Sequence, residues 1–331
     1  MTRRLAIGVP WQFDMRKEDA IELAKIADES GVDSFWVPEG WSHDAFSLLI
    51  SIAEKTNRIK LATGIVNVYS RTPGALAQHF ATLDQWSGGR AIIGLGASSA
   101  NVIEHFHGMP FQPAFARIKE TVEIINILMR GEKLVYNGRW FKMDRGFTLR
   151  LTPERPHIPI FIASLNEKST KQTAAIADGW MPVWIPLTAL KDQVAQFRAW
   201  AAEAGRDPAA VEVKSPGSVT VSKNPDAIDA GRPMTAYYIA RMGDFYYNHL
   251  SKLGYADEVA RVRRVFNEQG SEAGAAALSR PFLEEFGVAG DADTCRRRLE
   301  EQEAAGIDIH SVSIDTKDPV EFGRAVEALL R

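Results

Sequence analysis

Segments typical of strands and segments typical of helices alternate along this chain almost from its first residue. Such alternation is the pattern of a parallel sheet whose strands are joined by helices. Eight units of this kind predict an α/β fold of the closed (β/α)8 barrel type, also called a TIM barrel. We expect strands at 5–10, 34–39, 60–66, 90–97, 158–165, 180–185, 211–221 and 309–314.

Helix signals occur between these strands. Alanine and isoleucine recur on one face of 17–30, and Gly31 follows as a C-cap. A second helix is expected to begin near Asp44. A third is expected at Pro73, because proline suits the first helical position. A similar apolar stripe begins at Phe115.

The 331 residues exceed the usual barrel length of about 250 residues, so we expect insertions. The first, at about 131–152 after the fourth strand, contains "YNG" between alternating apolar residues and predicts a hairpin. The second, at about 223–287 after the seventh strand, is expected to be mostly helical. No polar linker separates two halves, so 1–331 is predicted to be one barrel domain.

Composition excludes several classes of function. The net charge is −3, and no block of lysine and arginine indicates a nucleic-acid or membrane partner. No apolar run is long enough to span a bilayer, and the first residues do not form a signal peptide, so we expect a soluble, cytoplasmic protein. The single cysteine, Cys295, excludes an internal disulfide and is expected to be a structural thiol in a helix.

The functional groups of a barrel gather where its strands end. This rule selects Glu39 as the one carboxylate at a predicted strand end, together with glycine, alanine, serine and tryptophan residues. Such a lining suits a large flat ligand whose own chemistry performs the reaction. The selected positions are 10–11, 39, 64–67, 97–99, 163–166, 183–184 and 215.

Other motifs are weaker signals. "GLGASS" at 94–99 lacks a third glycine and is expected to lack a helix directly after it, so it is not a dinucleotide fingerprint. It is either a tight turn or a seat for a planar ring. "HFHG" at 105–108 lacks further ligands, and no metal site is expected. His79 and His310 are expected to be structural, whereas His43 is either an acid–base group or a capping or surface residue.

The stretch 235–255 holds five of the seven tyrosines. Spacings of four, three and four predict a shared helical face, which favours a core or dimer-interface role over a pocket. The opposite face is expected to meet ligand or solvent. The first face carries Tyr238, Met242, Phe245 and His249, and the second carries Tyr237, Arg241 and Asp244.

The runs "TGIVNVYSRTPGALAQHFATLDQWSGGRAIIGLGASS", "HFHGMPF" and "IPIFIASLN" resemble the luciferase-like flavin-dependent oxidoreductases. They look most like the branch that uses the deazaflavin coenzyme F420, typified by methylenetetrahydromethanopterin reductase. The similarity runs from about residue 5 to residue 186 and resumes at "YIARMGDFYYNHLSKLGY" and "VAGDADTCRRRLEEQEAAGID".

The resemblance implies a non-prolyl cis peptide between Gly64 and Ile65, behind the deazaflavin ring. It also implies that Ala163, Ser164 and Leu165 hold the coenzyme phosphate. The coenzyme-binding residues expected from the strand ends and the resemblance together are Gly64, Ile65, Asn67, Ala97, Ser98, Ser99, Ala163, Ser164, Leu165 and Val183.

The chain departs from the branch at two places. Many members carry an Asp-His pair after the second strand, where this chain has "PEGW" at 38–41, with Glu39 to Trp41 at the matching place. Some members carry a carboxylate where this chain has Ser99. Glu39 is therefore the candidate proton donor. Helix capping, or a hydrogen bond to the coenzyme, is the alternative role of Glu39, and water is the alternative donor. The substrate pocket is expected to involve Trp11, Trp41, Trp184 and Tyr237.

These expectations favour a homodimeric oxidoreductase that transfers a hydride between coenzyme F420 and a small organic substrate. One alternative is an FMN-dependent monooxygenase of the same superfamily, in which the cavity shields a reactive flavin from water. Another is a non-catalytic flavin-binding or deazaflavin-binding protein.

Overall fold

The computed structural model describes residues 3–9, 16–112, 114–224 and 226–331. Within these residues one curled sheet contains eleven strands, and all of its pairings are parallel. The strands are β1 (Leu5–Gly8), β2 (Ser34–Val37), β3 (Lys60–Thr63), β4 (Val66–Asn67), β5 (Ala91–Gly96), β8 (Ile160–Ala163), β9 (Gly179–Met181), β10 (Glu212–Val213), β11 (Val219–Val221), β12 (Val288–Gly290) and β13 (His310–Ile314). Their order is β10-β9-β8-β5-β3-β2-β1-β13-β11-β12, with β4 also paired to β5.

The sheet closes on itself between β10 and β13. Lys214, directly after β10, pairs with Ile309 in a parallel bridge. The Ser215 N–H donates to the Ile309 carbonyl at 2.8 Å. Because β13 also pairs with β1, the ring is complete, and the predicted (β/α)8 barrel is confirmed.

Two predicted strands are interrupted. The prediction of one continuous seventh strand at 211–221 is wrong, because the chain leaves the sheet between β10 and β11. Pro216 has no N–H to give to a ladder, and a Cβ on Gly217 would lie 1.8 Å from the Phe286 carbonyl oxygen. The third strand, predicted at 60–66, is likewise divided into β3 and β4. Strand β12, with three residues, is too short to show an alternating pattern and was not predicted.

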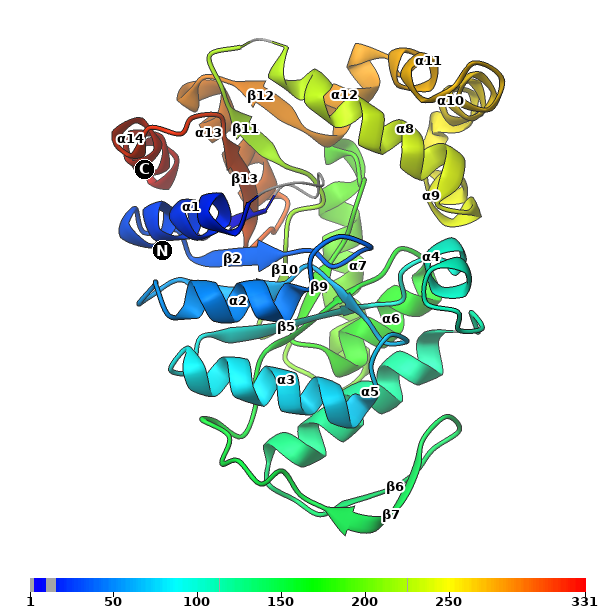
Figure 1. Cartoon of the computed structure of the whole chain (residues 1–331). Helices are drawn as coiled ribbons and strands as arrows, with labels where there is room; N and C mark the ends of the chain where they lie inside the picture. The colour runs from blue at the N-terminus through cyan, green and yellow to red at the C-terminus, as the bar shows by residue number, and fades with distance from the viewer. Residues whose placement is uncertain (1–2, 10–15, 113, 225) are drawn as a thin grey trace.

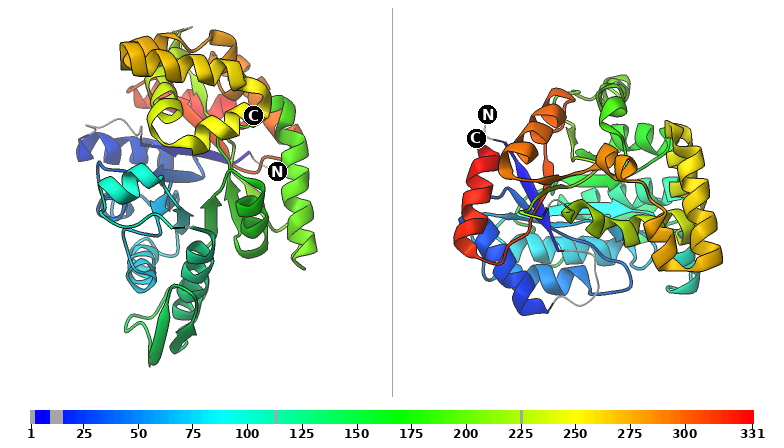
Figure 2. Two further views of the ribbon diagram at one scale, coloured as in Figure 1. Left: turned by 90° about the vertical axis from the view of Figure 1, so that its right-hand side faces the viewer. Right: turned by 90° about the horizontal axis from the view of Figure 1, so that it is seen from above.

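A ring of helices surrounds the sheet, in the contact order α1, α2, α3, α5, α6, α7, α13 and α14, which returns to α1 (Figures 1 and 2). The predicted helix starts are confirmed: Asp44 accepts from the Ser47 N–H at 2.7 Å, and Thr72 caps the helix that begins at Pro73. The helices are α1 (Lys17–Glu29), α2 (Ala45–Ala53), α3 (Pro73–Trp86), α4 (Ala100–His105), α5 (Ala114–Met129), α6 (Glu167–Ile176), α7 (Leu187–Glu203), α8 (Arg232–Arg241), α9 (Asp244–Leu250), α10 (Ala256–Gln269), α11 (Ser271–Ala276), α12 (Arg280–Phe286), α13 (Ala292–Ala304) and α14 (Pro319–Leu330).

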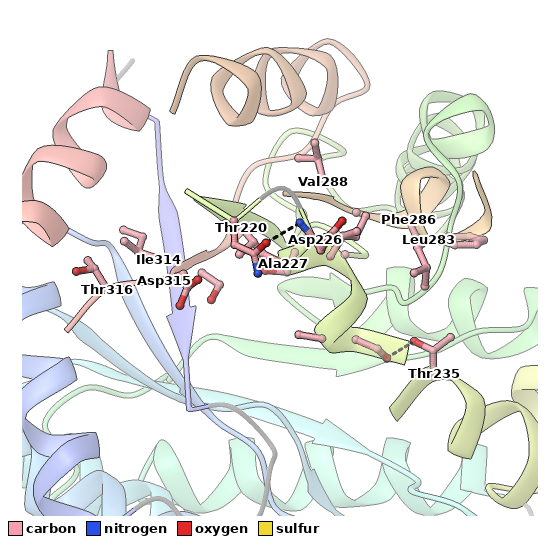
Figure 3. Close-up of a pocket in the computed structure, with 18 of the residues that line it drawn as sticks. Thr220, Asp226, Ala227, Thr235, Leu283, Phe286, Val288, Ile314, Asp315 and Thr316 are labelled. Atoms are coloured by element: carbon pink, nitrogen blue, oxygen red, sulfur yellow. Dashed lines mark hydrogen bonds between the residues drawn. The ribbon is translucent and has the colours of Figure 1, made fainter. Parts of the chain in front are cut away.

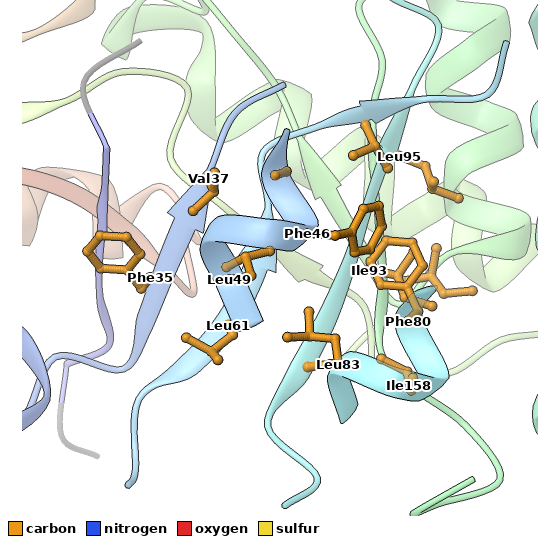
Figure 4. Close-up of a cluster of buried hydrophobic side chains, with 14 of the residues drawn as sticks. Phe35, Val37, Phe46, Leu49, Leu61, Phe80, Leu83, Ile93, Leu95 and Ile158 are labelled. Atoms are coloured by element: carbon orange, nitrogen blue, oxygen red, sulfur yellow. The ribbon is translucent and has the colours of Figure 1, made fainter. Parts of the chain in front are cut away.

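Two apolar layers hold the barrel together. Figure 4 shows the layer between strands and helices, where Phe46 and Phe80 from α2 and α3 pack near Ile93 of β5. Full burial of one such side chain contributes roughly 2–3 kcal/mol. A second cluster fills the inside of the barrel with Ala6, Trp36, Ala62, Ile92, Phe161 and Ile309. The inside of the barrel is therefore packed with side chains at this level.

The first insertion contains the predicted hairpin, formed by antiparallel strands β6 (Leu134–Asn137) and β7 (Lys142–Phe147). It projects below α5 in Figure 1. The buried carboxylate of Glu120 on α5 accepts hydrogen bonds from the N–H groups of Arg139, Trp140 and Phe141 at 2.7, 2.9 and 3.0 Å. One side chain thus fixes the tip of the hairpin to the helix.

The second insertion is helical, as predicted. It contains a 3-10 turn (Ala227–Gly231), helices α8 to α12 and a π-helical turn (Ser251–Tyr255). In Figure 1 the arrow of β2 points toward the side of the molecule where α4 and α9 lie. Cys295 of α13 is buried and its thiol donates to the Thr220 carbonyl at 3.2 Å, a structural role as expected. No helix among the described residues is long and apolar enough to cross a membrane.

His310 is structural, as expected, and gives a testable pH dependence. Its buried ring contacts the Gln302 amide oxygen at 2.9 Å, and burial lowers the pKa of His310 to about 4. The unfolded chain takes up this proton near pH 6.5, so the free energy of unfolding should fall by up to about 3 kcal/mol between pH 6.5 and 4. Urea unfolding across this range should show a flatter dependence for His310→Asn than for the native chain. The exposed His105→Asn is the control and should follow the native curve.

Candidate functional site

A cavity of about 570 Å³ lies at the carboxyl ends of the barrel strands, between the barrel and helices α4, α8 and α9. This volume is in the range of small-molecule sites. The structure brings most of the predicted site residues together here. Those that line the cavity are Glu39, Trp41, Gly64, Ile65, Ala97, Ser98, Ser99, Ala163, Ser164, Leu165 and Val183.

Three described residues of the predicted site lie outside this lining, and Trp11 lies outside the described residues. Asn67 is buried, and its side-chain oxygen accepts from the Tyr69 and Ser70 N–H groups at 2.9 and 2.8 Å, so it shapes the loop after β4. The ring of Trp184 packs edge to face with the rings of Tyr238 and Tyr246, which line the cavity. Tyr237 borders a separate hollow together with Arg241 and Asp244. The centroid of its ring lies 6.1 Å from that of the Trp41 ring.

The Gly64–Ile65 peptide bond is cis, as the resemblance implies. Here the chain leaves strand β5. Strand β3 pairs with β5 as far as Ala62, and β4 pairs with it again from Val66. Two glycines of "GLGASS" make room for this excursion. A Cβ on Gly94 would lie 1.7 Å from the Thr63 carbonyl oxygen, and a Cβ on Gly96 would lie 2.8 Å from the Ile65 side chain. Gly94 is thus explained by the close backbone of Thr63, and Gly96 by the close side chain of Ile65.

The prediction that no helix follows "GLGASS" is wrong. Helix α4 begins at Ala100, because the Ser99 hydroxyl accepts from the Val102 N–H at 3.4 Å and caps it. Ser98, directly before the cap, has φ +61°, a conformation that residues other than glycine seldom adopt. Ala97, Ser98 and Ser99 therefore form a sharp bend with small side chains along one wall of the cavity.

The loop 163–166 connects β8 to α6 on the next wall. The Ser164 carbonyl accepts from the Trp180 indole at 3.0 Å, and the Ser164 hydroxyl accepts from Thr173 at 3.1 Å. Asn166 and Ser169 form a reciprocal capping box at the start of α6. The start of a helix favours an anionic ligand, so this loop suits a phosphate group.

Glu39 is held by other protein groups. Its two oxygens form a bidentate pair with Arg71, with one contact at 3.0 Å, and it accepts from the Ala45 N–H at 3.0 Å, which caps α2. Burial alone would lower the pKa of Arg71, but the carboxylates of Glu39 and Asp44 raise it. Arg71 and the Ala45 N–H thus engage both oxygens of the Glu39 carboxylate.

Lys214 lines the same cavity and was not among the predicted site residues. It follows β10, where Val211 and Val213 pack against α7. In a closed barrel the face opposite these valines points inward, so the alternation in "VEVK" already indicated an interior lysine. Burial lowers the pKa of Lys214 to about 8.

The predicted helical face in 235–255 is only partly correct. The helix breaks at Gly243, with φ +80°, into α8 and α9, so the four residues do not share one helix. Arg263 joins the two parts, with Nε 3.0 Å from the Ile239 carbonyl and Nη1 2.8 Å from Asp244. The first three residues of the face, Tyr238, Met242 and Phe245, together with Tyr246, line the cavity. His249 donates from Nε2 to the Trp184 carbonyl, 3.0 Å away.

A larger cavity of about 1040 Å³ lies between α1, the ends of β11 and β13, and α12 (Figure 3). It gathers Trp184 but none of the other predicted site residues, so we assign the site to the smaller cavity. Of the remaining histidines, His43 is exposed, and His107 lies 3.5 Å from the Asn67 amide. The described residues contain no group of three or more His, Cys, Asp or Glu side chains that could hold a metal.

Comparisons with known proteins agree with this geometry. Residues 5–308 match the sequence model of the family described as luciferase-like monooxygenase. The chain is 30% identical over 313 residues to 5,10-methylenetetrahydromethanopterin reductase of Archaeoglobus fulgidus, covering 92% of this chain and 91% of that protein.

Solved structures of two kinds share the fold. Coenzyme F420 dependent tetrahydromethanopterin reductase of Methanopyrus kandleri superposes with a TM-score of 0.85 at 23% identity, covering 100% of this chain and 98% of the other. The oxygenating constituent of 3,6-diketocamphane monooxygenase from a Pseudomonas putida plasmid, in complex with FMN, gives 0.71 at 18% identity, covering 100% and 98%.

The pair of Glu39 and Arg71 should couple strongly. Their side chains are only 9% and 18% exposed, so loss of either partner leaves a poorly hydrated charge. In a double-mutant cycle with Glu39→Gln and Arg71→Met, urea unfolding should give a coupling energy of about 1–3 kcal/mol. The exposed pair Lys171–Glu203 is the matched control and should couple by less than about 1 kcal/mol. Equal coupling in the two cycles would contradict the assignment.

Proposed function

This chain belongs to the luciferase-like monooxygenase family, and from that premise we propose that it is an oxidoreductase that binds coenzyme F420. The reaction is transfer of a hydride between the deazaflavin and a small organic substrate. Among relatives, the 30% identical reductase of Archaeoglobus fulgidus supports this branch of the family.

The observation that carries the proposal is a flat wall of small residues in a cavity large enough for a tricyclic ring. Gly64, Gly96, Ala97 and Ala163 present little side-chain volume, and Ile65 stands beside them. A planar ring can lie against such a wall, whereas larger side chains would hold it away. Ser98, Ser99 and Val183 border the same space.

The loop of Ala163, Ser164 and Leu165 would hold the coenzyme phosphate. It leads into α6, whose first turn offers a favourable field for an anion, and its conformation is fixed by the Trp180 and Thr173 hydrogen bonds. When bound, the deazaflavin supplies or accepts the hydride. The described chain then contributes binding, orientation and an enclosed space.

We assign Glu39 a positioning role. Its pair with Arg71 fixes the segment between β2 and α2, which carries Trp41 to the cavity. Tyr238, Met242 and Phe245 cover the cavity from the helical insertion with mostly apolar surface, which excludes water from the reacting groups.

Binding of an FMN cofactor is the second candidate, supported by the shared fold of the FMN-bound monooxygenase. Titration of the purified apoprotein with each coenzyme, followed by fluorescence, separates the two. Saturable binding of coenzyme F420 with weak binding of FMN is expected. The opposite ranking would favour the monooxygenase. Tight binding without turnover across a broad panel of acceptors would favour a non-catalytic binding protein.

A substitution in the wall should locate the coenzyme. Ala163→Phe places a phenyl group in the cavity, and coenzyme F420 should bind at least tenfold more weakly, which corresponds to about 1.4 kcal/mol. Ala202 is exposed on α7, so Ala202→Phe is the matched control and should bind as the native chain does. Unchanged affinity of a folded Ala163→Phe protein would place the coenzyme elsewhere.

A further inference from the structure

One cation in the cavity lacks an anionic partner. The Lys214 ammonium donates to the Ser311 hydroxyl and lies 5.1 Å from the centroid of a Trp36 ring. Among the described residues, no carboxylate lies within ion-pair distance of it, and it is the only lysine or arginine in the cavity lining. The Lys214 side chain is half-buried and faces the cavity.

Such a group is costly to keep charged. A hydroxyl and an indole face replace only part of the hydration that an ammonium loses inside a protein. The acidic residue of the cavity, Glu39, cannot compensate, because Arg71 already occupies both of its oxygens. An electron-rich oxygen of a bound molecule would complete the surroundings of Lys214.

The strand order places Lys214 opposite the wall assigned to the coenzyme. Three strands separate β10 from β3 in each direction around the barrel: β9, β8 and β5 on one side, and β13, β1 and β2 on the other. Trp36 lies between the two positions. The Lys214 ammonium lies over the Trp36 ring, and a Cβ on Gly64 would lie 3.5 Å from the Trp36 side chain. A ring against Gly64 and Ile65 therefore turns its free face toward Lys214.

Resting on the hydride transfer proposed above, we propose that Lys214 binds the oxygen of a carbonyl substrate and gives it a proton. The carbonyl carbon accepts the hydride with its two electrons, and the π pair moves to the oxygen. That oxygen takes the proton from Nζ, which leaves a neutral amine and an alcohol. Solvent returns a proton to the amine. The substrate class is thus an aldehyde or ketone.

The ionisation of Lys214 suits this step. A pKa of about 8, lowered by burial, keeps the amine protonated at neutral pH yet able to release its proton. The other titratable groups of the lining are Glu39, paired with Arg71, and two tyrosines whose pKa values burial raises, that of Tyr238 to about 12. Glu212, two residues before Lys214, is paired with Arg4. A loss of rate above pH 8 would therefore report Lys214.

The first experiment compares Lys214→Met, Lys214→Arg and the exposed control Lys55→Met with the native chain. With reduced coenzyme F420 and cyclohexanone or benzaldehyde, Lys214→Met should lose at least 100-fold in kcat/KM, together with the decline above pH 8. Lys214→Arg keeps the charge and should retain binding of the carbonyl but not the rate. Lys55→Met should change nothing.

Two readouts do not depend on turnover. Benzoate, a planar oxyanion, should bind native apoprotein at least tenfold more tightly than Lys214→Met, and removal of a buried charge should raise the melting temperature of that variant at pH 7. Coenzyme F420 affinity should stay within threefold of native. Failure of the native chain to bind the coenzyme overturns the proposed function, while the benzoate comparison still decides whether Lys214 holds an oxygen.

The proposal is overturned by any of four results. The first is equal benzoate binding by the native chain and Lys214→Met. The second is loss of coenzyme affinity in Lys214→Met, which would place the lysine against the coenzyme. The third is unchanged carbonyl reduction by that variant. The fourth is reduction by the native chain of an imine such as 1-pyrroline but of neither carbonyl probe.

Discussion

The closure of the sheet between β10 and β13 is the constraint on which the rest of this structure depends. Once the ring is complete, each strand of the ring has one face toward the helices and one toward the barrel axis. The axial residues Trp36 and Phe161 meet edge to face, with ring centroids 5.7 Å apart, and fill the lower part of the barrel. The cavity assigned to the ligand lies above these two rings, at the carboxyl ends of the strands.

The position of the site was predictable for the same reason. Parallel strands end on one side, so eleven residues chosen by their place at strand ends, or by resemblance to the family, meet in one cavity. Lys214 was missed because its strand alternates polar and apolar residues, a pattern that in an open sheet means one wet face. In a closed ring the polar face points inward, so the same alternating pattern places the charge of Lys214 inside the barrel.

Other differences follow from interactions between distant segments. The break in the seventh strand depends on the approach of the Phe286 carbonyl to Gly217, across an insertion of more than sixty residues by sequence number. The tyrosine-rich helix is divided at Gly243, and Arg263 binds residues on both sides of the break. The local sequence pattern does not show this contact. Local periodicity identifies such elements, but not the contacts that interrupt them.

The separation of α8 from α9 has a consequence for how this protein can diversify. Tyr238 belongs to one short helix and Phe245 to the other, while the barrel wall beneath them is built from different strands. Inherited changes in either helix can therefore alter the cover of the cavity without changing the strands beneath it. Substrate specificity can change in this way among related proteins while the barrel residues of the cavity stay the same.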